Sequence, residues 1–271
     1  MNAPPALPRA ADLEQLAVDL AEGAADVVRA GRLGGVTAAA KSTATDLVTE
    51  VDRATERWLT DRLTQLRPGD AILGEEEGDR AGTTGVRWVL DPIDGTVNFV
   101  LGLPQFAVSV AAEVDGAVVA GAVCNPVSGE TFHARRGGGA QLGGVRLTGP
   151  RTVPLQRAVV GTGFGYDAAA RARQVAVLAP VLPAVGDVRR LGAASLDLCF
   201  LAAGRLDAYY EAGLHPWDHA AGGLIATEAG CVVSGLRDSP PSERCVAAAG
   251  PDLAAEFFAL LESVDADRVS R

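Results

Sequence analysis

Two aspartates three positions apart, Asp91 and Asp94, are the residues best placed to do chemistry. They lie in residues 88–99, which read WVLDPIDGTVNF. An apolar run ends at Asp91, so we expect a strand to deliver it, and Pro92 favours an extended backbone there. A helix is expected to begin just after Asp94, and carboxylates beside such backbone amides can hold cations and phosphate oxygens together. The alternative is structural, with Asp91 as a cap and Asp94 in a turn.

A second group of acids, Glu75 to Glu77, follows another short apolar run within the segment GEEEG. A carboxylate at the end of a strand can converge with the acids of a neighbouring strand. The alternative is a solvated run of charge, which is the usual fate of consecutive glutamates.

Two further segments carry isolated acids. In DLVTEVD, residues 46–52, Asp46 is predicted to cap the helix that follows, whereas Asp52 has no clear role by itself. In HPWDHAAGGLIATEAG, residues 215–230, Asp218 is expected to precede a helix over residues 220–229, with N-capping as the alternative role. The small residues at 220–223 would let that helix approach another backbone closely, in the core or at a tight site.

Other kinds of catalytic chemistry find little support. The histidines show no metal-ligand spacing, and each is expected to be a surface or structural residue; they are His133, His215 and His219. No G-x-S-x-G motif occurs, which disfavours a serine or cysteine nucleophile. The segment GTGFG, residues 161–165, matches neither a dinucleotide fingerprint nor a P-loop and is predicted to be a loop.

Composition narrows the class of protein. The 271 residues are 48% hydrophobic and 21% charged, as in a folded globular chain, and the formal net charge is −10. Such an acidic surface repels phosphate backbones and anionic lipids, so neither nucleic acid nor membrane is an expected partner. The four cysteines are widely spaced and are expected to be reduced and buried. With no signal-peptide pattern, the sequence predicts a cytoplasmic protein.

Hydrophobic periodicity predicts helices interleaved with strands throughout. We therefore expect a layered αβαβα sandwich of the α+β class that forms one unit over residues 1–271. Its first half, residues 1–150, is expected to contain a sheet rich in antiparallel strands, and its second half, 151–271, a mixed α/β arrangement. Helices are expected over 13–28, from after Asp46 to Pro68, and over 168–182, 195–203, 220–229 and 251–263; strands over 71–73, 88–90, 106–114, 117–124, 131–134, 145–147, 158–161, 187–190, 206–211, 231–234 and 245–249.

Taken together, these motifs resemble the inositol monophosphatase family of metal-dependent phosphatases. The resemblance extends over residues 13–261 and rests on GEE at 74–76, LDPIDGT at 90–96 and WDHAAGGLIATEAG at 217–230, in the family's order. The segment DLVTEVD matches the preceding helix of the family, and residues 189–211 resemble its bacterial inositol-phosphate branch. Val97 and Leu101 depart from the usual motif, but neither is at a metal-ligand position.

The resemblance implies a set of metal ligands and a cofactor. Glu75, Asp91, Asp94 and Asp218 match the carboxylate ligands, and Ile93 matches the residue that contributes a carbonyl oxygen. This all-oxygen set suits Mg²⁺ better than zinc. One ion, on Glu75, Asp91 and Ile93, would activate a water, and a second, on Asp91, Asp94 and Asp218, would neutralise charge on the ester oxygen.

The resemblance also implies residues that act on the water and the substrate. Thr96 and Glu75 match the pair that orients the attacking water, and Asp52 matches an aspartate beside that threonine. Positions that contact phosphate match Asp94, Gly95 and Thr96, and positions that contact the inositol ring match Ala194 and Glu211. The implied assembly is a homodimer.

Several functions stay open at this point. The leading hypothesis is hydrolysis of inositol 1-phosphate, a small phosphorylated substrate. Histidinol phosphate, fructose bisphosphate and a 3′-phosphonucleotide are alternatives, the last disfavoured because no basic cluster is present to hold a second phosphate. A regulatory or interaction protein on a phosphatase scaffold is a different class of function. A calcium-buffering or carbohydrate-binding module is disfavoured because the DPxDG string lacks the ligand spacing of an EF-hand loop.

Overall fold

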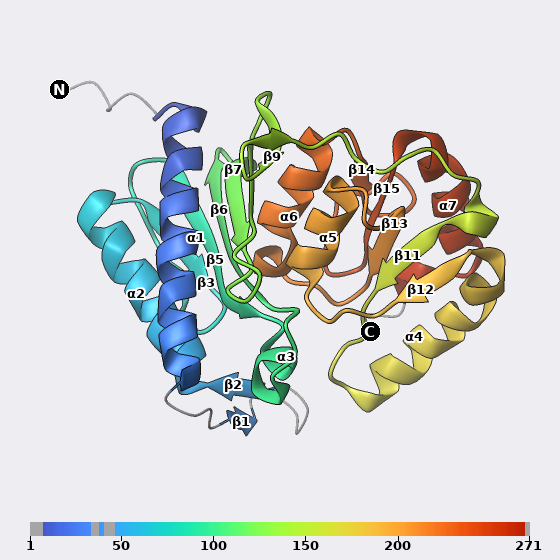
Figure 1. Ribbon diagram of the computed structural model, residues 1–271, viewed down its shortest axis with the longest axis horizontal. Helices are drawn as coiled ribbons and strands as arrows, with labels where there is room; N and C mark the ends of the chain where they lie inside the picture. Colours follow the sequence, from blue (N-terminus) through green and yellow to red (C-terminus); the bar gives the residue numbers. More distant parts are fainter. Residues whose placement is uncertain (1–7, 34–37, 41–46, 269–271) are drawn as a thin grey trace.

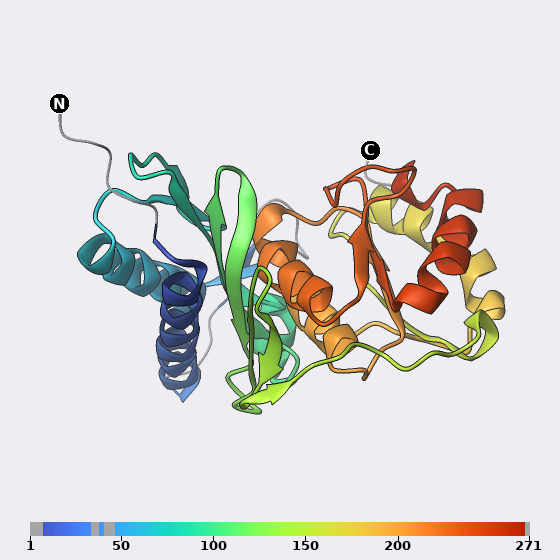
Figure 2. The same cartoon turned by 90° about the horizontal axis from the view of Figure 1, so that it is seen from above.

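Helices and sheets alternate in five layers (Figures 1 and 2). The computed structural model describes residues 8–33, 38–40 and 47–268. Its elements are α1 (Ala10–Leu33), β1 (Ala38–Ala40), β2 (Leu47–Thr49), α2 (Glu50–Leu66), β3 (Ala71–Gly74), β4 (Gly78–Arg80), β5 (Val86–Asp94), α3 (Thr96–Leu101), β6 (Ala107–Val114), β7 (Ala117–Cys124), β8 (Thr131–Arg135), β9 (Gly139–Leu142), β10 (Val145–Arg146), η1 (Leu155–Arg157), β11 (Val159–Thr162), α4 (Ala168–Val181), η2 (Leu182–Ala184), β12 (Asp187–Arg189), α5 (Ala194–Ala202), β13 (Ala208–Glu211), α6 (Pro216–Glu228), β14 (Val232–Ser234), β15 (Val246–Ala249), α7 (Pro251–Ser263) and η3 (Ala266–Arg268). The predicted layered α+β sandwich is confirmed.

The first sheet has the strand order β10-β9-β8-β7-β6-β5-β3-β4. Its neighbouring strands run antiparallel except β3 and β5, which are parallel. The β6–β7 hairpin turns at Asp115 and Gly116, which both have positive φ, at 52° and 75°. This geometry matches the tight Asp-Gly turn predicted from the sequence.

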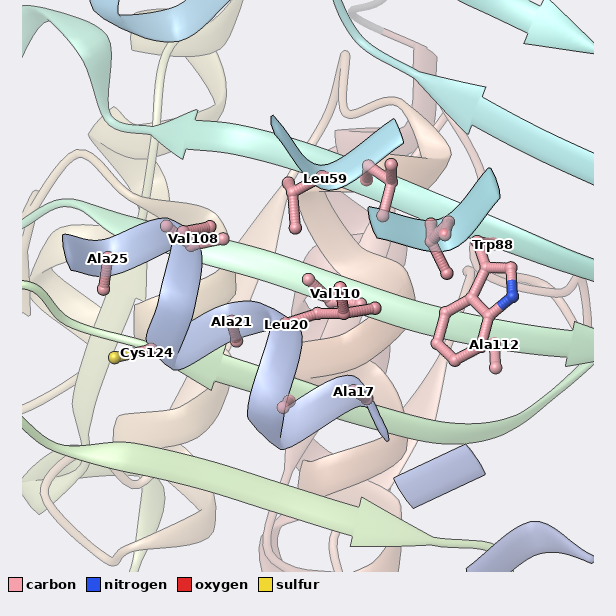
Figure 3. Close-up of a cluster of buried hydrophobic side chains, with 14 of the residues drawn as sticks. Ala17, Leu20, Ala21, Ala25, Leu59, Trp88, Val108, Val110, Ala112 and Cys124 are labelled. Carbon is pink, nitrogen blue, oxygen red and sulfur yellow. The ribbon is translucent and has the colours of Figure 1, made fainter. Parts of the chain in front are cut away.

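Side chains alternate between the two faces along each strand, and both faces of this sheet are buried. Trp88, Val108 and Val110 point toward α1 and α2, and Figure 3 shows the last of these against Leu20 and Ala21 of α1. Their sequence neighbours point the opposite way, toward α5 and α6. Because side chains of a strand alternate between faces, one strand can anchor two helical layers.

The second sheet has the order β12-β11-β13-β15-β14. Strand β11 pairs in parallel with β12 and β13, while β15 runs antiparallel to β13 and β14, so the sheet is mixed as predicted. Tyr209 packs toward α5 and α6, whereas Tyr210 packs toward α4 and α7. Helices α5 and α6 therefore form a middle layer shared by both sheets (Figure 2).

The small residues of α6 serve packing within this middle layer. A Cβ on Gly222 would lie 2.9 Å from both the Cβ of Leu198 and the carbonyl oxygen of Ser195 on α5. On the sheet side, a Cβ on Gly121 of β7 would lie 3.0 Å from the Cα of Ala221. Of the two roles left open by the sequence, close core packing is the one observed.

The helix expected directly after Asp46 begins later than predicted. Asp46 and its expected capping role lie outside the described residues, and Val48 belongs to β2, paired with Ala39. Thr49 is the residue before α2, and its Oγ1 accepts hydrogen bonds from the backbone amides of Val51 and Asp52. A threonine cap of this kind stops the strand and starts the helix, which explains the shifted boundary.

The helix that carries Asp218 begins earlier than predicted. It starts at Pro216 rather than at residue 220, so Asp218 lies inside its first turn and does not precede it. Proline suits this first position because its fixed φ is helical and its missing N–H would have no partner within the helix. Strands β1, β4 and β9 were also absent from the sequence prediction.

Two further observations bear on the class of protein. No helix in the described part of the chain has the length and apolar content needed to span a membrane. The four cysteines are free thiols and all of them are buried, as expected.

Candidate active site

A cavity of 310 Å³ collects the ends of elements from both sheets. It is lined by the end of β5 and start of α3, the turn after β3, the loop after β11, the segment between β12 and α5, the end of β13 and the first turn of α6. Its lining residues are Glu75, Asp91, Ile93, Asp94, Gly95, Thr96, Gly163, Phe164, Gly165, Tyr166, Arg190, Gly192, Ala194, Glu211, Ala212, Gly213, Leu214, His215, Trp217 and Asp218.

The backbone around Pro92 turns both aspartates of the DPID segment into this cavity. Strand β5 pairs regularly with β6 up to Asp91, then skips to Asp94, so the register breaks over these residues. Proline cannot donate a ladder hydrogen bond, which explains a break at this position. The amide of Ile93 donates to Asp91 Oδ1 at 3.0 Å and fixes that carboxylate.

Helix α3 begins directly after this break, as predicted. Gly95 precedes it in the left-handed conformation, with φ 89°. A Cβ there would also lie 3.0 Å from the carbonyl oxygens of Gln105 and Gly192, so glycine is required both by its conformation and by the space available.

Three carboxylates predicted as metal ligands meet at this point. Asp91, Asp94 and Asp218 each offer an oxygen, and these oxygens lie within 4.8 Å of one another. Glu75, the fourth predicted carboxylate ligand, lines the same cavity, and so does Ile93. Acids from β5, α6 and the turn after β3 thus converge although they are distant in the sequence.

The protonation of these acids reflects their crowding. Burial raises the pKa of Asp91 well above its ordinary value, and the negative charges of Glu75 and Asp94 raise it further. Burial likewise raises the pKa of Asp94 to about 7, against the opposing effect of hydrogen bonds from Ser195. The pKa of Asp218 is raised by burial and by the charge of Asp94. Cations would relieve this repulsion.

Hydrogen bonds orient two of these carboxylates. Asp94 Oδ2 accepts from the backbone amide and the hydroxyl of Ser195, at 2.7 and 2.5 Å. Asp218 Oδ2 accepts from the amide of His215 at 2.7 Å. Side chains fixed in this way are preorganised to bind a shared ligand.

A hydroxyl and a buried carboxylate lie beside the acid cluster. Thr96 Oγ1 is 3.1 Å from Asp52 Oδ1 and 3.0 Å from the carbonyl oxygen of Ile93, and it can donate its proton to either. Asp52 is fully buried, lies behind the cavity wall and also accepts from the amide of Thr49 at 2.9 Å. The predicted proximity of Asp52 and Thr96 is thus present in the structure.

The same cavity holds the residues expected to contact a substrate ring. Ala194 begins α5 and Glu211 ends β13, and both line the cavity. Tyr209 donates a hydrogen bond to Glu211 Oε2 at 2.6 Å. A Cβ on Gly163 would lie 2.1 Å from that same oxygen, so the glycine leaves room for the carboxylate.

Sequence reasoning missed several residues of this cavity. Arg190 is the single lysine or arginine among the described residues that line it. His215, expected to be a surface or structural residue, lies at the cavity with its ring stacked on Trp217, centroids 4.9 Å apart. The segment GTGFG also contributes, through residues 163–165. The resemblance at residues 189–211 is the signal that could have drawn attention to Arg190.

The donor set fits a hard divalent cation. Five acidic side chains and a single arginine line the described cavity, so its carboxylates lack matching positive charge. Carboxylate and carbonyl oxygens are the ligands that Mg²⁺, Ca²⁺ and Mn²⁺ prefer, whereas zinc favours histidine and cysteine. The residues present therefore suit Mg²⁺.

Fold and site together define a class of protein. A layered αβαβα sandwich that brings an oxygen-only acid cluster and a buried threonine–aspartate pair into one cavity is suited to metal-dependent hydrolysis of phosphoric monoesters.

Comparison with known proteins places the chain within that class. It belongs to the inositol monophosphatase family, whose model matches residues 10–266, and it is thus a phosphoric monoester hydrolase. The inositol-1-monophosphatase of Mycobacterium leprae is 53% identical over 243 residues, which cover 86% of this chain and 84% of the relative. The solved structure of Mycobacterium tuberculosis SuhB has a TM-score of 0.84 and 46% identity, covering 97% of this chain and all of the other (100%). The Nus factor SuhB of Escherichia coli K12 is 43% identical over 191 residues, covering 70% of this chain and 72% of the relative.

Proposed function

We propose that this enzyme hydrolyses inositol 1-phosphate to inositol and phosphate in a Mg²⁺-dependent reaction. The observation that carries the proposal is the convergence of Asp91, Asp94 and Asp218 beside Thr96 in a cavity with little positive charge of its own. A relative named inositol-1-monophosphatase, identical at 53% of positions, supports the choice of substrate.

Five residues would hold the metal ions. Asp91 would be shared, with Glu75 and the Ile93 carbonyl on one side and Asp94 and Asp218 on the other. Divalent ions bound there neutralise charge on the phosphoryl group and lower the pKa of a nearby water. Because the substrate is a dianion and the described lining holds five acids against one arginine, these lining residues do not supply that neutralisation.

Thr96 and Glu75 would orient the attacking water, with Asp52 fixing the hydroxyl of Thr96. When the Thr96 hydroxyl donates to Asp52, its lone pairs are left to accept a hydrogen bond from a water in the cavity. That hydrogen bond fixes the direction of the water's remaining lone pair toward phosphorus. Glu75 lines the same cavity and would accept the water's second proton.

The lining around Glu211 and Ala194 suits a hydroxyl-rich ring. Glu211 can accept hydrogen bonds from ring hydroxyls while Tyr209 holds one of its oxygens. Ala194 is small and leaves space for a ring, while Gly163 leaves room for the carboxylate of Glu211. Gly95 and Thr96, at the start of α3, would lie beside the phosphate, together with Asp94. Among the described residues of the lining Arg190 is the single arginine or lysine, which argues against substrates that carry a second phosphate.

Phosphate release from a panel of monoesters tests the proposal. The purified full chain is assayed with inositol 1-phosphate, histidinol phosphate, fructose bisphosphate and a 3′-phosphonucleotide, each with Mg²⁺ and with EDTA. Inositol 1-phosphate is expected to have the highest kcat/KM and to require Mg²⁺. A clear preference for another ester would overturn the substrate, and equal rates in EDTA would overturn the metal requirement.

A second candidate function concerns transcription. The similarity to a relative named Nus factor SuhB, 43% identical over 191 residues, favours a regulatory or interaction role on the same scaffold. Co-purification with RNA polymerase from the native organism tests this role. An Asp91→Asn variant that still co-purifies would separate the interaction from catalysis.

Three further expectations are part of the proposal. A homodimer is supported by membership of the family, and light scattering on the purified chain tests it.

A cytoplasmic location is supported by four buried, unpaired thiols, which are typical of reducing compartments. Residues 1–271 are proposed to unfold as one unit, which calorimetry would report as a single transition.

A further inference from the structure

We propose that Glu56 is a positioning residue, which holds the turn that carries Glu75 and so sets the geometry of the metal site. This role lies outside the ligand and water-orienting residues described above. The inference rests on the proposed function for its activity readout alone, because ion binding can be measured without turnover.

The carboxylate of Glu56 binds two consecutive backbone amides of that turn. Its Oε2 accepts from the amide of Glu76 at 2.9 Å, and its Oε1 accepts from the amide of Glu77 at 2.6 Å. The two bonds use separate oxygens, so they fix the orientation of the peptide planes directly after Glu75. Glu56 is only 1% exposed, and water therefore cannot replace it easily.

The strand before the turn is adapted to this contact. Gly74 is the last residue of β3, and a Cβ added to it would lie 2.1 Å from Glu56 Oε1. Its φ is not positive, so space rather than backbone conformation requires the glycine here. The sequence thus keeps a gap directly before Glu75 that the carboxylate of Glu56 fills.

One face of α2 supports both parts of the proposed water-orienting pair. Asp52 and Glu56 are four residues apart, so they project from the same side of the helix. Asp52 holds the hydroxyl of Thr96, and Glu56 holds the turn after Glu75. The first two turns of α2 therefore fix the relative position of two groups that come from different segments.

Burying the carboxyl group of Glu56 costs folding free energy, so a specific role is expected for it. Burial raises the pKa of Glu56 to about 7, and the nearby charges of Glu76 and Glu77 also raise it, while the two amides oppose the shift. An apolar side chain could fill the same space without burying a carboxyl group. Such an apolar residue would, however, lack the two acceptor oxygens that bind the adjacent amides.

Glu56→Gln and a matched control test this role. The variant keeps the shape of the side chain but replaces one acceptor oxygen with an NH₂ group, which cannot accept from a backbone amide. Glu77→Gln makes the same chemical change on an exposed side chain in the same turn. Mg²⁺ binding is followed by the Mg²⁺-dependent rise in Tm and by calorimetric titration, and phosphate release gives kcat and KM.

Glu56→Gln is expected to weaken Mg²⁺ binding by about tenfold, in the range found for residues that orient metal ligands. At saturating Mg²⁺ its kcat should fall while KM for the ester stays unchanged, because Glu211 and Ala194 are untouched. The Tm without metal should change by a few degrees at most, because the loss of one amide acceptor is offset by the removal of a buried charge. Glu77→Gln should match the wild type in every measurement.

Gly74→Ala provides a second route if Glu56→Gln does not fold. It leaves the carboxyl group intact but displaces it from the amides, so it should lower Mg²⁺ affinity in the same direction. Wild-type Mg²⁺ affinity and kcat in a folded Glu56→Gln or Gly74→Ala variant would overturn the proposal, and so would a lower metal-free Tm with unchanged Mg²⁺ affinity. If the wild type releases phosphate from no ester while Glu56→Gln still loses Mg²⁺ binding, the proposed function fails and the role of Glu56 stands.

Discussion

The acid cluster of the active site and a single buried acid in η3 are built in opposite ways. At the active site, Asp91, Asp94 and Asp218 face one another, and burial with mutual repulsion raises their pKa values. In η3, the carboxylate of Asp267 is 3% exposed and is held by the guanidinium groups of Arg237 and Arg244. Burial alone would raise the pKa of Asp267, but these arginines outweigh it and lower the pKa.

The difference separates acids that stabilise the fold from acids that serve the reaction. Where a carboxylate has arginine partners, the chain itself neutralises the charge. The energy of that ion pair then contributes to the free energy of folding. Where several carboxylates meet without such partners, neutralisation is left to a ligand, and the fold bears the repulsion until that ligand binds.

The largest expected effect comes from Asp91→Asn. Loss of the shared carboxylate should lower kcat/KM for inositol 1-phosphate by at least about 100-fold, since bound metal contributes several kcal/mol to such reactions. The Mg²⁺-dependent rise in Tm should also shrink, while the Tm in EDTA should not fall because a repulsive buried charge is gone. Phosphate release and thermal melts measure both. Full activity in this variant would contradict the assignment of Asp91.

Asp267→Asn should have the opposite profile. We expect a loss of about 2 kcal/mol in the free energy of unfolding, below the figure for fully buried ion pairs because both arginines are partly exposed. Urea denaturation measures the loss, and phosphate release at 25 °C should be retained. Asp265→Asn is the control, because its carboxylate contacts the same Arg237 but is 52% exposed, and it should change stability by less. Equal losses of unfolding free energy in the two variants would show that the burial of Asp267 does not strengthen its ion pairs.

The last expected effect is a pH dependence of opposite sign at the active site and at Asp267. Because folding raises the pKa of the site acids, with Asp94 at about 7, the native state without metal holds extra protons, and its stability falls as pH rises from about 4 to about 7. The contribution of Asp267, whose pKa is lowered, is instead present at neutral pH and is lost as pH falls below about 4.

Thermal melts between pH 5 and 8 test this sign. In EDTA the Tm should fall with rising pH by roughly 2–4 °C for each kcal/mol lost. Saturating Mg²⁺ should remove the decline, since the ions bind the deprotonated carboxylates. Asp94→Asn should flatten the slope in EDTA. A Tm that rises with pH in EDTA would contradict the raised pKa values.

Local patterns in the sequence predicted most elements of this fold. The Asp115-Gly116 hairpin and the start of α3 at Thr96 both follow from backbone preferences of a few neighbouring residues. The early start of α6 was missed although Pro216 is itself a helix-start signal, since the run of small residues that follows is more conspicuous. The late start of α2 was missed because Thr49 competes with Asp46 as a cap.

The site was predictable only in part. The acids of the DPID segment could be identified as a pair, but their meeting with Asp218 depends on how α6 packs against the first sheet, which the sequence does not encode locally. Ser195, Arg190 and Glu56 were missed for the same reason. Ser195 and Glu56 contact segments far away in the chain, and Arg190 is identified only by its place in the cavity lining. The fold class and family prediction are confirmed, whereas the roles of the individual site residues stay proposals.

The position of α6 in the middle layer has one more consequence. Asp91 belongs to a strand of the first sheet, and Asp218 belongs to a helix that packs against both sheets. An ion held by both residues would act as a removable crosslink between neighbouring layers. Loading and unloading that ion would tighten and loosen the whole sandwich, so resistance to proteases should track the metal supply of the cell.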